Sequence, residues 1–214
     1  QQSIGHRLVY FLNLEATAPQ SIKLHVGHLL TSIWAGGLES FVLSLSRGVV
    51  EHGIATTVYS WTGDDLWADE FRRHGVRILS IGGPKRIHSP LDVFRFALAW
   101  IRLVRQFRRD GVQILHTHDF LPSLIGRTAA IAARVPGRIT TLHNLYDWWP
   151  KWVHLANRVL AHKTQSITCV SESVRTFMIE RSGLPASKLV TILNGVDENR
   201  FRSNSEARAR IRTE

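Results

Sequence analysis

The hydrophobic and polar positions of this 214-residue chain follow two alternating periods. A mostly apolar run at 24–30 predicts a buried strand, and the pair Gly36 and Gly37 then interrupts the pattern. After the glycines, apolar residues return at the 3, 4, 7 and 11 spacing of one helix face, at Leu38, Phe41, Val42, Leu45 and Val49. This segment therefore predicts a strand, a glycine loop and a helix in succession.

The same change of period recurs along the chain. Short runs rich in β-branched and aromatic residues predict further strands at 55–61, 76–81, 113–118, 138–143, 166–170 and 189–193. Helical spacing between them predicts helices at 67–74, 89–109, 121–134, 152–162 and 171–181. Strands that alternate with helices are typical of a doubly wound sheet, so we predict an α/β, Rossmann-like fold with a mostly parallel sheet of about seven strands.

The helix expected at 89–109 has the clearest start in the chain. Ser89 is a favourable cap, Pro90 suits the first helical position, and Asp92 places an acid in the first turn. Its apolar residues at helical spacing are expected to form the face that packs on the sheet. They are Leu91, Phe94, Leu98, Ile101 and Val104.

The positive charge of the chain predicts a negatively charged partner. The chain is 44% hydrophobic and 21% charged, which is ordinary for a globular protein, but its net charge is +10. Between Arg72 and Asp110 there are ten Lys or Arg and two Asp, which is a net +8 in one segment. Anionic lipids or a phosphorylated acceptor would satisfy this charge, whereas nucleic acid is not expected, because the segment lacks interleaved aromatic residues and a reading-helix motif.

Four arginines of the 89–109 helix are the candidates for such a surface. Arg95, Arg102, Arg105 and Arg109 sit mostly off the expected apolar face, and no acid follows Asp92 within the helix. A basic amphipathic helix of this kind lies on anionic membranes. A merely solvated face is the alternative.

The cellular compartment is indicated by what the chain lacks. A single cysteine, Cys169, excludes a disulfide framework and favours a reducing compartment. No apolar run reaches the ~20 residues that span a bilayer. We therefore expect a cytoplasmic protein, peripheral on the inner face of a membrane.

The glycine loop is a candidate anion site. In a parallel sheet it would lie at the carboxyl end of its strand, where ligands bind. Gly36 and Gly37 allow close approach of the backbone, and the free N–H groups at the helix start favour a diphosphate. A tight turn without a ligand is equally compatible with a Gly-Gly pair.

Two histidines are the candidate catalytic residues. His116 and His118 are two apart on an expected strand, so they share a face, and Asp119 follows at the strand's end. A metal site would need a third ligand, such as His143, and the incomplete set leads us to predict no metal. We expect His116 to be structural, bonded to nearby backbone, and His118 to contact substrate or stabilise developing charge.

An aromatic segment follows the expected fifth strand. Trp148 and Trp149 could stack on a sugar, anchor at a membrane interface, or pack against the sheet. The sequence leaves these alternatives open.

Several patches together resemble the amino-terminal domain of a GT-B glycosyltransferase of the retaining family 4 type. The resemblance covers about residues 22–202 and rests on the order of five motifs. These are Ala35-Gly36-Gly37-Leu38-Glu39, Leu115-His116-Thr117-His118-Asp119, Thr141-Leu142-His143, Val170-Ser171-Glu172-Ser173-Val174, and Leu193-Asn194-Gly195-Val196-Asp197 with Phe201.

This resemblance implies two Rossmann-like domains with the active site between them. It implies a nucleotide-sugar donor such as a UDP- or GDP-sugar, with no separate cofactor, and a sugar or lipid-linked acceptor. On the matching motifs, Gly36, Gly37 and Asn194 are expected at the donor diphosphate, and His118 beside the transferred sugar. Acceptor binding is assigned to Glu39, His143, Trp148 and Trp149.

The resemblance also divides the chain. Residues 1–20 are expected to be an extension, 21–202 the acceptor-side domain, and 203–214 the start of a hinge or second domain that the chain does not include. Donor binding would then need that second domain or a separate subunit, so the chain alone is expected to be inactive.

The resulting hypothesis is a retaining hexosyl transfer from a nucleotide-sugar to a lipid-linked or other acceptor. A nucleotide-sugar epimerase on the same scaffold is a second hypothesis. A module without enzyme activity that binds anionic lipid or carbohydrate is a third.

Overall fold

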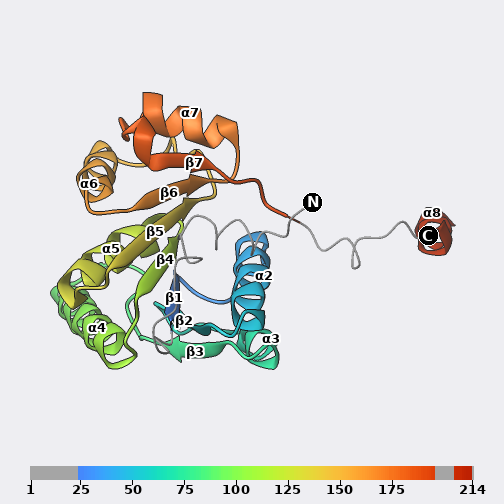
Figure 1. Ribbon diagram of the computed structural model, residues 1–214, viewed down its shortest axis with the longest axis horizontal. Helices are drawn as coiled ribbons and strands as arrows, with labels where there is room; N and C mark the ends of the chain where they lie inside the picture. The colour runs from blue at the N-terminus through green and yellow to red at the C-terminus, as the bar shows by residue number, and fades with distance from the viewer. Residues whose placement is uncertain (1–23, 196–204, 214) are drawn as a thin grey trace, which may run out of the picture.

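The computed structural model describes residues 24–195 and 205–213. Residues 24–195 form one seven-stranded parallel sheet with helices on both faces (Figure 1). The strands are β1 (His25–Leu30), β2 (Ala55–Ser60), β3 (Arg77–Ser80), β4 (Ile114–His118), β5 (Gly137–Leu142), β6 (Ser166–Cys169) and β7 (Leu189–Thr191). The helices are α2 (Gly37–Glu51), α3 (Ala68–Arg73), α4 (Pro90–Arg109), α5 (Phe120–Ala133), α6 (Lys151–Ala161), α7 (Glu172–Glu180) and α8 (Ser205–Thr213), with a 3-10 turn at Ala186–Lys188. The predicted fold class is therefore confirmed, and the expected strands and helices agree with the observed ones to within a few residues at their ends.

The strand order β3-β2-β1-β4-β5-β6-β7 creates the position where a ligand can enter. The chain moves outward in one direction from β1 and in the other direction from β4, so the two adjacent strands send their helices to opposite faces. Figure 1 shows α2 and α3 on one side of the sheet and α4, α5 and α6 on the other. In open α/β sheets the crevice at such a reversal, outside the carboxyl ends of the strands, is the usual binding place.

Close packing of α5 on the sheet depends on Gly126. A Cβ atom at this residue would lie 2.6 Å from Thr117 Cγ2 and 2.7 Å from Leu29 Cδ2. The glycine thus lets α5 approach β1 and β4 directly, and this contact supports the strand ends that carry the candidate site.

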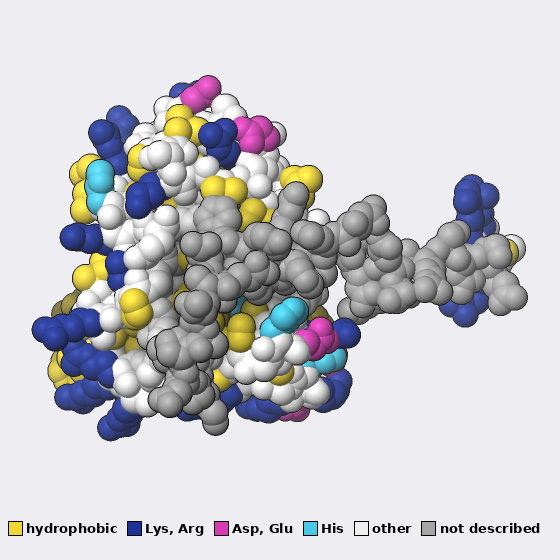
Figure 2. Space-filling model, viewed as in Figure 1, with side chains coloured by type: hydrophobic (Ala, Val, Ile, Leu, Met, Phe, Trp, Pro, Cys, Tyr) yellow, Lys and Arg dark blue, Asp and Glu magenta, His cyan; other side chains and the backbone are white. Residues whose placement is uncertain are grey.

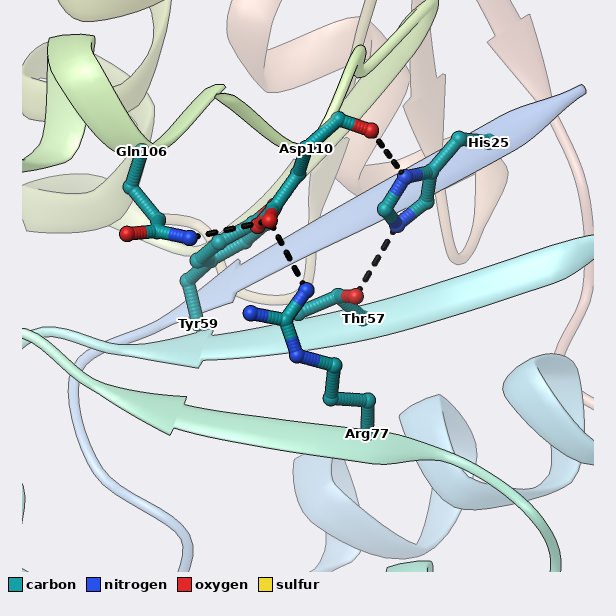
Figure 3. Close-up of polar contacts among 6 residues, drawn as sticks. All are labelled: His25, Thr57, Tyr59, Arg77, Gln106 and Asp110. Carbon is teal, nitrogen blue, oxygen red and sulfur yellow. Dashed lines mark hydrogen bonds and ion pairs between the residues drawn. The ribbon is translucent and has the colours of Figure 1, made fainter. Parts of the chain in front are cut away.

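A cluster of polar side chains connects α4 to the sheet at the amino ends of the strands (Figure 3). Asp110, at the end of α4, accepts hydrogen bonds from Tyr59 Oη at 2.6 Å, Arg77 Nη1 at 2.8 Å and Gln106 Nε2 at 2.9 Å. Burial alone would raise the pKa of Asp110, but these donors hold it below its usual value. One carboxylate therefore fastens α4 to β2 and β3 at the amino ends of the strands, opposite to the binding edge.

His25 completes this cluster through the backbone. Its Nδ1 lies 2.6 Å from the carbonyl oxygen of Asp110, which can only accept, so Nδ1 carries the proton. Its Nε2 then accepts from the Thr57 hydroxyl at 2.9 Å. The start of β1 is thus fixed to both α4 and β2.

The expected apolar face of α4 is wrong. Four of its five residues are exposed: Leu91 at 55%, Phe94 at 59%, Leu98 at 45% and Ile101 at 39%. The helix instead packs through the next row around its circumference, which contains Ala99, Leu103, Val104 and Phe107. Two apolar rows run along this helix, and the spacing alone did not distinguish the row that meets the sheet.

Among the described residues, no helix combines the length and apolar character needed to cross a bilayer. The expected extension at 1–20, and Val196, Asp197 and Phe201 of the last motif, lie outside the described residues. The expected domain boundaries stay predictions.

Candidate functional site

The glycine loop lies where it was predicted, at the carboxyl end of β1. Gly36 is the extended residue that precedes α2, with φ −145° and ψ 174°, and no side chain caps the helix start. A Cβ atom at Gly37 would meet nothing within 4 Å. The first N–H groups of α2 are therefore free of a capping side chain beside an open surface, as an anion site requires.

The carboxylate of Glu39 lies over this loop. A Cβ atom at Gly36 would be 2.5 Å from Glu39 Oε2, so the glycine is needed for the acid to fold back this far. A carboxylate near a helix start is stabilised by the positive end of the helix dipole.

Four histidines meet beside the loop, and we call His28, His116, His118 and His143 the histidine cluster. His28 on β1 is in register with His116 on the neighbouring β4, and His118 follows two residues later on the same face. His28 Nδ1 lies 3.1 Å from His118 Nε2, and His118 Nδ1 lies 3.4 Å from His143 Nε2. The cluster thus joins the tips of β1, β4 and β5 through ring nitrogens.

The cluster is uncharged at neutral pH. Burial lowers the pKa of His28 and of His143 to about 4. Burial first, and then its histidine neighbours, lower the pKa of His116 and of His118 well below the usual value. Each ring therefore carries one proton and can donate one hydrogen bond and accept another.

His143 is the member nearest to solvent, because it is only half-buried whereas the other three are buried. Phe41 of α2 packs edge-on against both His143 and His118, with ring centroids 5.3 Å and 6.0 Å apart. The backbone N–H of His143 donates to the Tyr146 hydroxyl at 3.2 Å, which draws the following loop over the strand end. An incoming ligand would meet His143 before it meets His118.

His116 has the structural role expected of it, with a different partner. Its Nε2 lies 2.6 Å from the Thr141 hydroxyl, a side chain and not the backbone. This contact joins β4 to β5 beneath the cluster.

Among the described residues, the group that could hold a metal ion is His28, His116 and His118, each of which offers one ring nitrogen within 4.8 Å of the other two. The third residue of this group is His28, whereas the sequence indicated His143 as the candidate third ligand. Ligand nitrogens on one zinc ion lie about 3.3 Å apart, because each Zn–N bond is roughly 2.0–2.1 Å. The rings of His28 and His118 already lie 3.1 Å apart in a hydrogen bond, so a cluster held by hydrogen bonds accounts for the arrangement, and the absence of a metal stays a prediction.

Asp119 is a site residue whose importance the sequence did not reveal. Its backbone has φ 69° and ψ −175°, and its buried Oδ1 has no hydrogen-bond partner among the described residues. Burial, with a smaller contribution from nearby Glu39, raises the pKa of Asp119 to about 6. The signal was its place directly after His-Thr-His at a strand end. For His28, the signal was a second imidazole, three residues after His25, inside an otherwise apolar strand.

Three other predicted site residues lie outside the histidine cluster itself. Asn194 is exposed and follows β7, which is two strands from β5, the strand that precedes His143. Trp149 stacks on Tyr146 with ring centroids 4.0 Å apart, whereas Trp148 is 66% exposed. The structure therefore brings together the glycine loop, Glu39, His118 and His143. Trp148 and Trp149 both contact Tyr146, whose hydroxyl accepts from the backbone of His143, and the expected roles of the tryptophans and of Asn194 stay predictions.

The four arginines are exposed on α4, away from the cluster. Arg95 is 3.7 Å from the Asp92 carboxylate, and Arg102 donates to the carbonyl oxygen of Ile81 at 2.8 Å. Arg105 and Arg109 have no ion-pair or hydrogen-bond partner in the described part of the chain. Figure 2 shows Lys and Arg side chains gathered at the lower left, where Figure 1 places α4.

Solved structures share this fold. HepE from Anabaena, in complex with UDP and glucose, matches with a TM-score of 0.72 and 16% identity over 88% of this chain and 49% of that chain. Sucrose-phosphate synthase from Thermosynechococcus elongatus has a TM-score of 0.68 and 14% identity over 88% and 52%. A UDP-N-acetylglucosamine 2-epimerase from Rickettsia bellii is less similar, with a TM-score of 0.52 and 12% identity over 79% and 44%. The chain thus spans about half the length of the structures that it matches.

At these identities the structural likeness shows the fold alone. No curated protein sequence matches the chain. The sequence profile of Glycosyltransferase Family 4 does match, over residues 35–200, from the glycine loop to the connection after β7. This match confirms the resemblance to the amino-terminal domain of a GT-B glycosyltransferase, and the chain belongs to Glycosyltransferase Family 4.

Proposed function

We propose that this chain is the acceptor-side half of a retaining glycosyltransferase that transfers a hexosyl group from a nucleotide-sugar to a lipid-linked or other sugar acceptor. The observation that carries the proposal is the meeting of the uncapped start of α2 with the histidine cluster at the reversal between β1 and β4. A diphosphate at the N–H groups of α2 would place the attached sugar beside these rings. The complexes of HepE with UDP and glucose, and with UDP-glucose, on the same fold support a nucleotide-sugar donor.

In the proposed reaction the bond between the sugar's anomeric carbon and the diphosphate oxygen breaks. The acceptor hydroxyl oxygen forms the new bond on the same face, and its proton passes to the departing diphosphate. His118 and His143 hydrogen-bond the sugar, and the N–H groups of α2 stabilise the charge that develops on the diphosphate. No separate cofactor takes part.

The test is turnover by an enzyme that joins this chain to a donor-binding domain. We expect His118→Ala to lower kcat by about 10²–10³-fold, the usual loss when one group that stabilises the transition state is removed. Arg72→Ala on α3, in an exposed ion pair on the opposite face of the sheet from α4, is the control. Unchanged turnover in His118→Ala would refute the role of this residue.

An epimerase is the competing enzyme, since a 2-epimerase shares the fold at lower similarity. An epimerase needs no acceptor. We expect release of free nucleotide only when an acceptor is added, and release without one would favour epimerisation or hydrolysis.

We also propose that α4 holds the protein on an anionic membrane at its cytoplasmic face. The exposed row Leu91, Phe94, Leu98 and Ile101 is an apolar stripe without a partner in the described part of the chain. Arginines flank it, and Asp92 is the sole acid in α4, α5 and α6. An exposed apolar stripe with cations beside it fits a lipid surface and not merely a solvated face.

Co-sedimentation with vesicles tests this proposal. We expect binding to vesicles that contain phosphatidylglycerol, weaker binding to neutral vesicles, and partial loss with salt. Replacing Phe94 and Leu98 by Ser should abolish binding, and Arg105→Glu with Arg109→Glu should remove its dependence on anionic lipid. Arg72→Glu and Arg73→Glu on α3 are the charge-matched control, and equal losses from both pairs would indicate a merely basic surface.

A further inference from the structure

The hydrogen bonds of the histidine cluster run in one direction. His28, His118 and His143 are joined by two contacts between ring nitrogens, and each such contact can hold only one proton. All three rings are neutral, so each has one N–H group. If His28 Nδ1 donates to His118 Nε2, then His118 must carry its proton on Nδ1 and donate to His143. The reverse direction moves all three protons together.

The two ends of this chain of hydrogen bonds decide its direction. At the inner end, His28 is fully buried and its Nε2 has no partner among the described residues. A proton on that nitrogen would be a buried donor without an acceptor, which is rare and costly in proteins. At the outer end, His143 is half-buried and its Nδ1 can meet water or a ligand. The proton of His28 therefore lies on Nδ1.

We propose that His28 is a positioning residue that locks His118 as the tautomer protonated on Nδ1, so that His118 offers an N–H donor to the substrate on the side of His143. His118 Nε2 is occupied by His28 at 3.1 Å. The outer contact, from His118 Nδ1 to His143, is longer at 3.4 Å and is the one that a sugar oxygen can replace. The tautomer of His118 is inferred from the hydrogen bonds of the histidine cluster alone. The use of this tautomer in sugar binding rests on the proposed function.

The lock predicts which kind of group His118 recognises. A fixed N–H donor selects an acceptor atom, such as a hydroxyl or ring oxygen of the sugar, and disfavours a group that can only donate. Without the lock, either tautomer could form and the site would lose this preference.

Histidine tautomers can be observed directly in the 214-residue chain. With ¹⁵N-labelled histidine, long-range ¹H–¹⁵N correlation spectra separate protonated from bare ring nitrogens. We expect His28 and His118 to be protonated on Nδ1 and bare on Nε2 at pH 7. Protonation of His118 on Nε2 would overturn the proposal, and so would a spectral change on addition of EDTA, because it would put a metal ion in place of the hydrogen bond.

Three substitutions of His28 separate the lock from simple packing. His28→Asn keeps an amide N–H group near the position of Nδ1, so His118 should remain protonated on Nδ1. His28→Gln places its amide near the position of Nε2, and His28→Leu has no donor, so both should give a mixture of tautomers. A His118 signal unchanged in the Gln and Leu variants would overturn the proposal.

His116→Gln is the matched control, because His116 is a buried neighbour that bonds Thr141 and not His118. A Gln side chain can keep that bond, and the His118 tautomer should be unchanged. Loss of the Nδ1 signal in this variant would mean that general packing sets the tautomer, against the proposal.

Turnover gives the functional readout in an enzyme that joins this chain to a donor-binding domain. The wrong tautomer of a catalytic histidine costs about 10⁴ in kcat in a serine-protease triad. We expect His28→Leu to lower kcat at least tenfold, with acceptor KM little changed and His28→Asn restoring most of the loss. If the spectra follow the lock while kcat does not change, the proposed use of His118 fails and the lock remains.

Discussion

Asp119 occupies a backbone conformation that is costly for any residue with a side chain. Its φ of 69° and ψ of −175° fall in a region that is essentially restricted to glycine, and such a residue costs roughly 1–3 kcal/mol. Its buried, unpaired Oδ1 and raised pKa add to the cost. Strain of this kind persists at ligand sites, and Asp119 stands between the histidine cluster and the start of α5.

Replacing Asp119 by glycine should therefore stabilise the fold. We expect Asp119→Gly to raise the unfolding free energy by about 1 kcal/mol at pH 7, because relieved strain outweighs the added entropy of the unfolded chain. Urea denaturation measures the change. Asp119→Asn keeps the strain and removes only the charge, so it should gain less, and a loss of stability in Asp119→Gly would show that the carboxylate supports the fold.

Asp110 differs from Asp119, because its buried carboxylate is fully hydrogen-bonded. Its side chain is 7% exposed and receives three donors. We expect Asp110→Ala to cost about 3 kcal/mol of unfolding free energy, since buried partners such as Tyr59 would lose their acceptor. Asp69→Ala, which removes an 80% exposed acid paired with Arg72, should change it by about 0.5 kcal/mol or less.

Asp110→Ala should leave the histidine cluster unchanged, because Asp110 lies at the amino ends of the strands and the cluster lies toward their carboxyl ends. The His118 tautomer in Asp110→Ala should match that of the unmodified chain wherever the variant is folded. A shifted tautomer would mean that the two ends of the sheet are coupled.

At the scale of elements, the period of apolar residues predicted the seven strands of the sheet and the helices α2 to α7, because each buries one face or is buried on both. The same pattern gave the wrong row of α4, since this helix carries two apolar rows and tertiary packing selects between them. The histidine cluster was predicted only in part. His116 and His118 follow from their spacing, but His28 joins them through the parallel register of β1 and β4, which no local pattern contains.

The contact between α5 and the sheet can be tested with a pair of glycines. Gly126→Ala should lower the unfolding free energy by about 1–3 kcal/mol, because its Cβ collides with Thr117 and Leu29. At Gly48, in the last turn of α2, an added Cβ would meet nothing within 4 Å, so Gly48→Ala should raise the unfolding free energy by about 0.5–1 kcal/mol, since alanine favours the helix. Thermal unfolding of both variants measures this difference, and equal shifts would contradict the close approach of α5.

For the whole molecule, the histidine cluster predicts how stability depends on pH. All four rings have a pKa below the usual 6.5, so the unfolded chain takes up protons below pH 6.5 that the native chain does not. Asp119 works in the other direction, because its native pKa is raised to about 6. The four lowered pKa values outweigh the single raised one, so near pH 5 unfolding takes up protons and stability falls as the pH is lowered.

Urea denaturation at pH 7, 6 and 5 measures this slope. Stability should be highest near neutral pH and fall as the pH is lowered. Equal stability at pH 7 and pH 5 would mean that the four rings are accessible to protons in the native state.

The reversal of strand order between β1 and β4 has a consequence for the order of events in folding. A ligand bound as proposed would contact backbone near residue 36 and side chains near residues 118 and 143, which only long crossovers bring together. Parallel pairings between distant segments form slowly, after much of the local structure. Capture of a nucleotide-sugar fragment would thus be a late event in refolding, and a fluorescent ligand could report the moment at which the last strands dock.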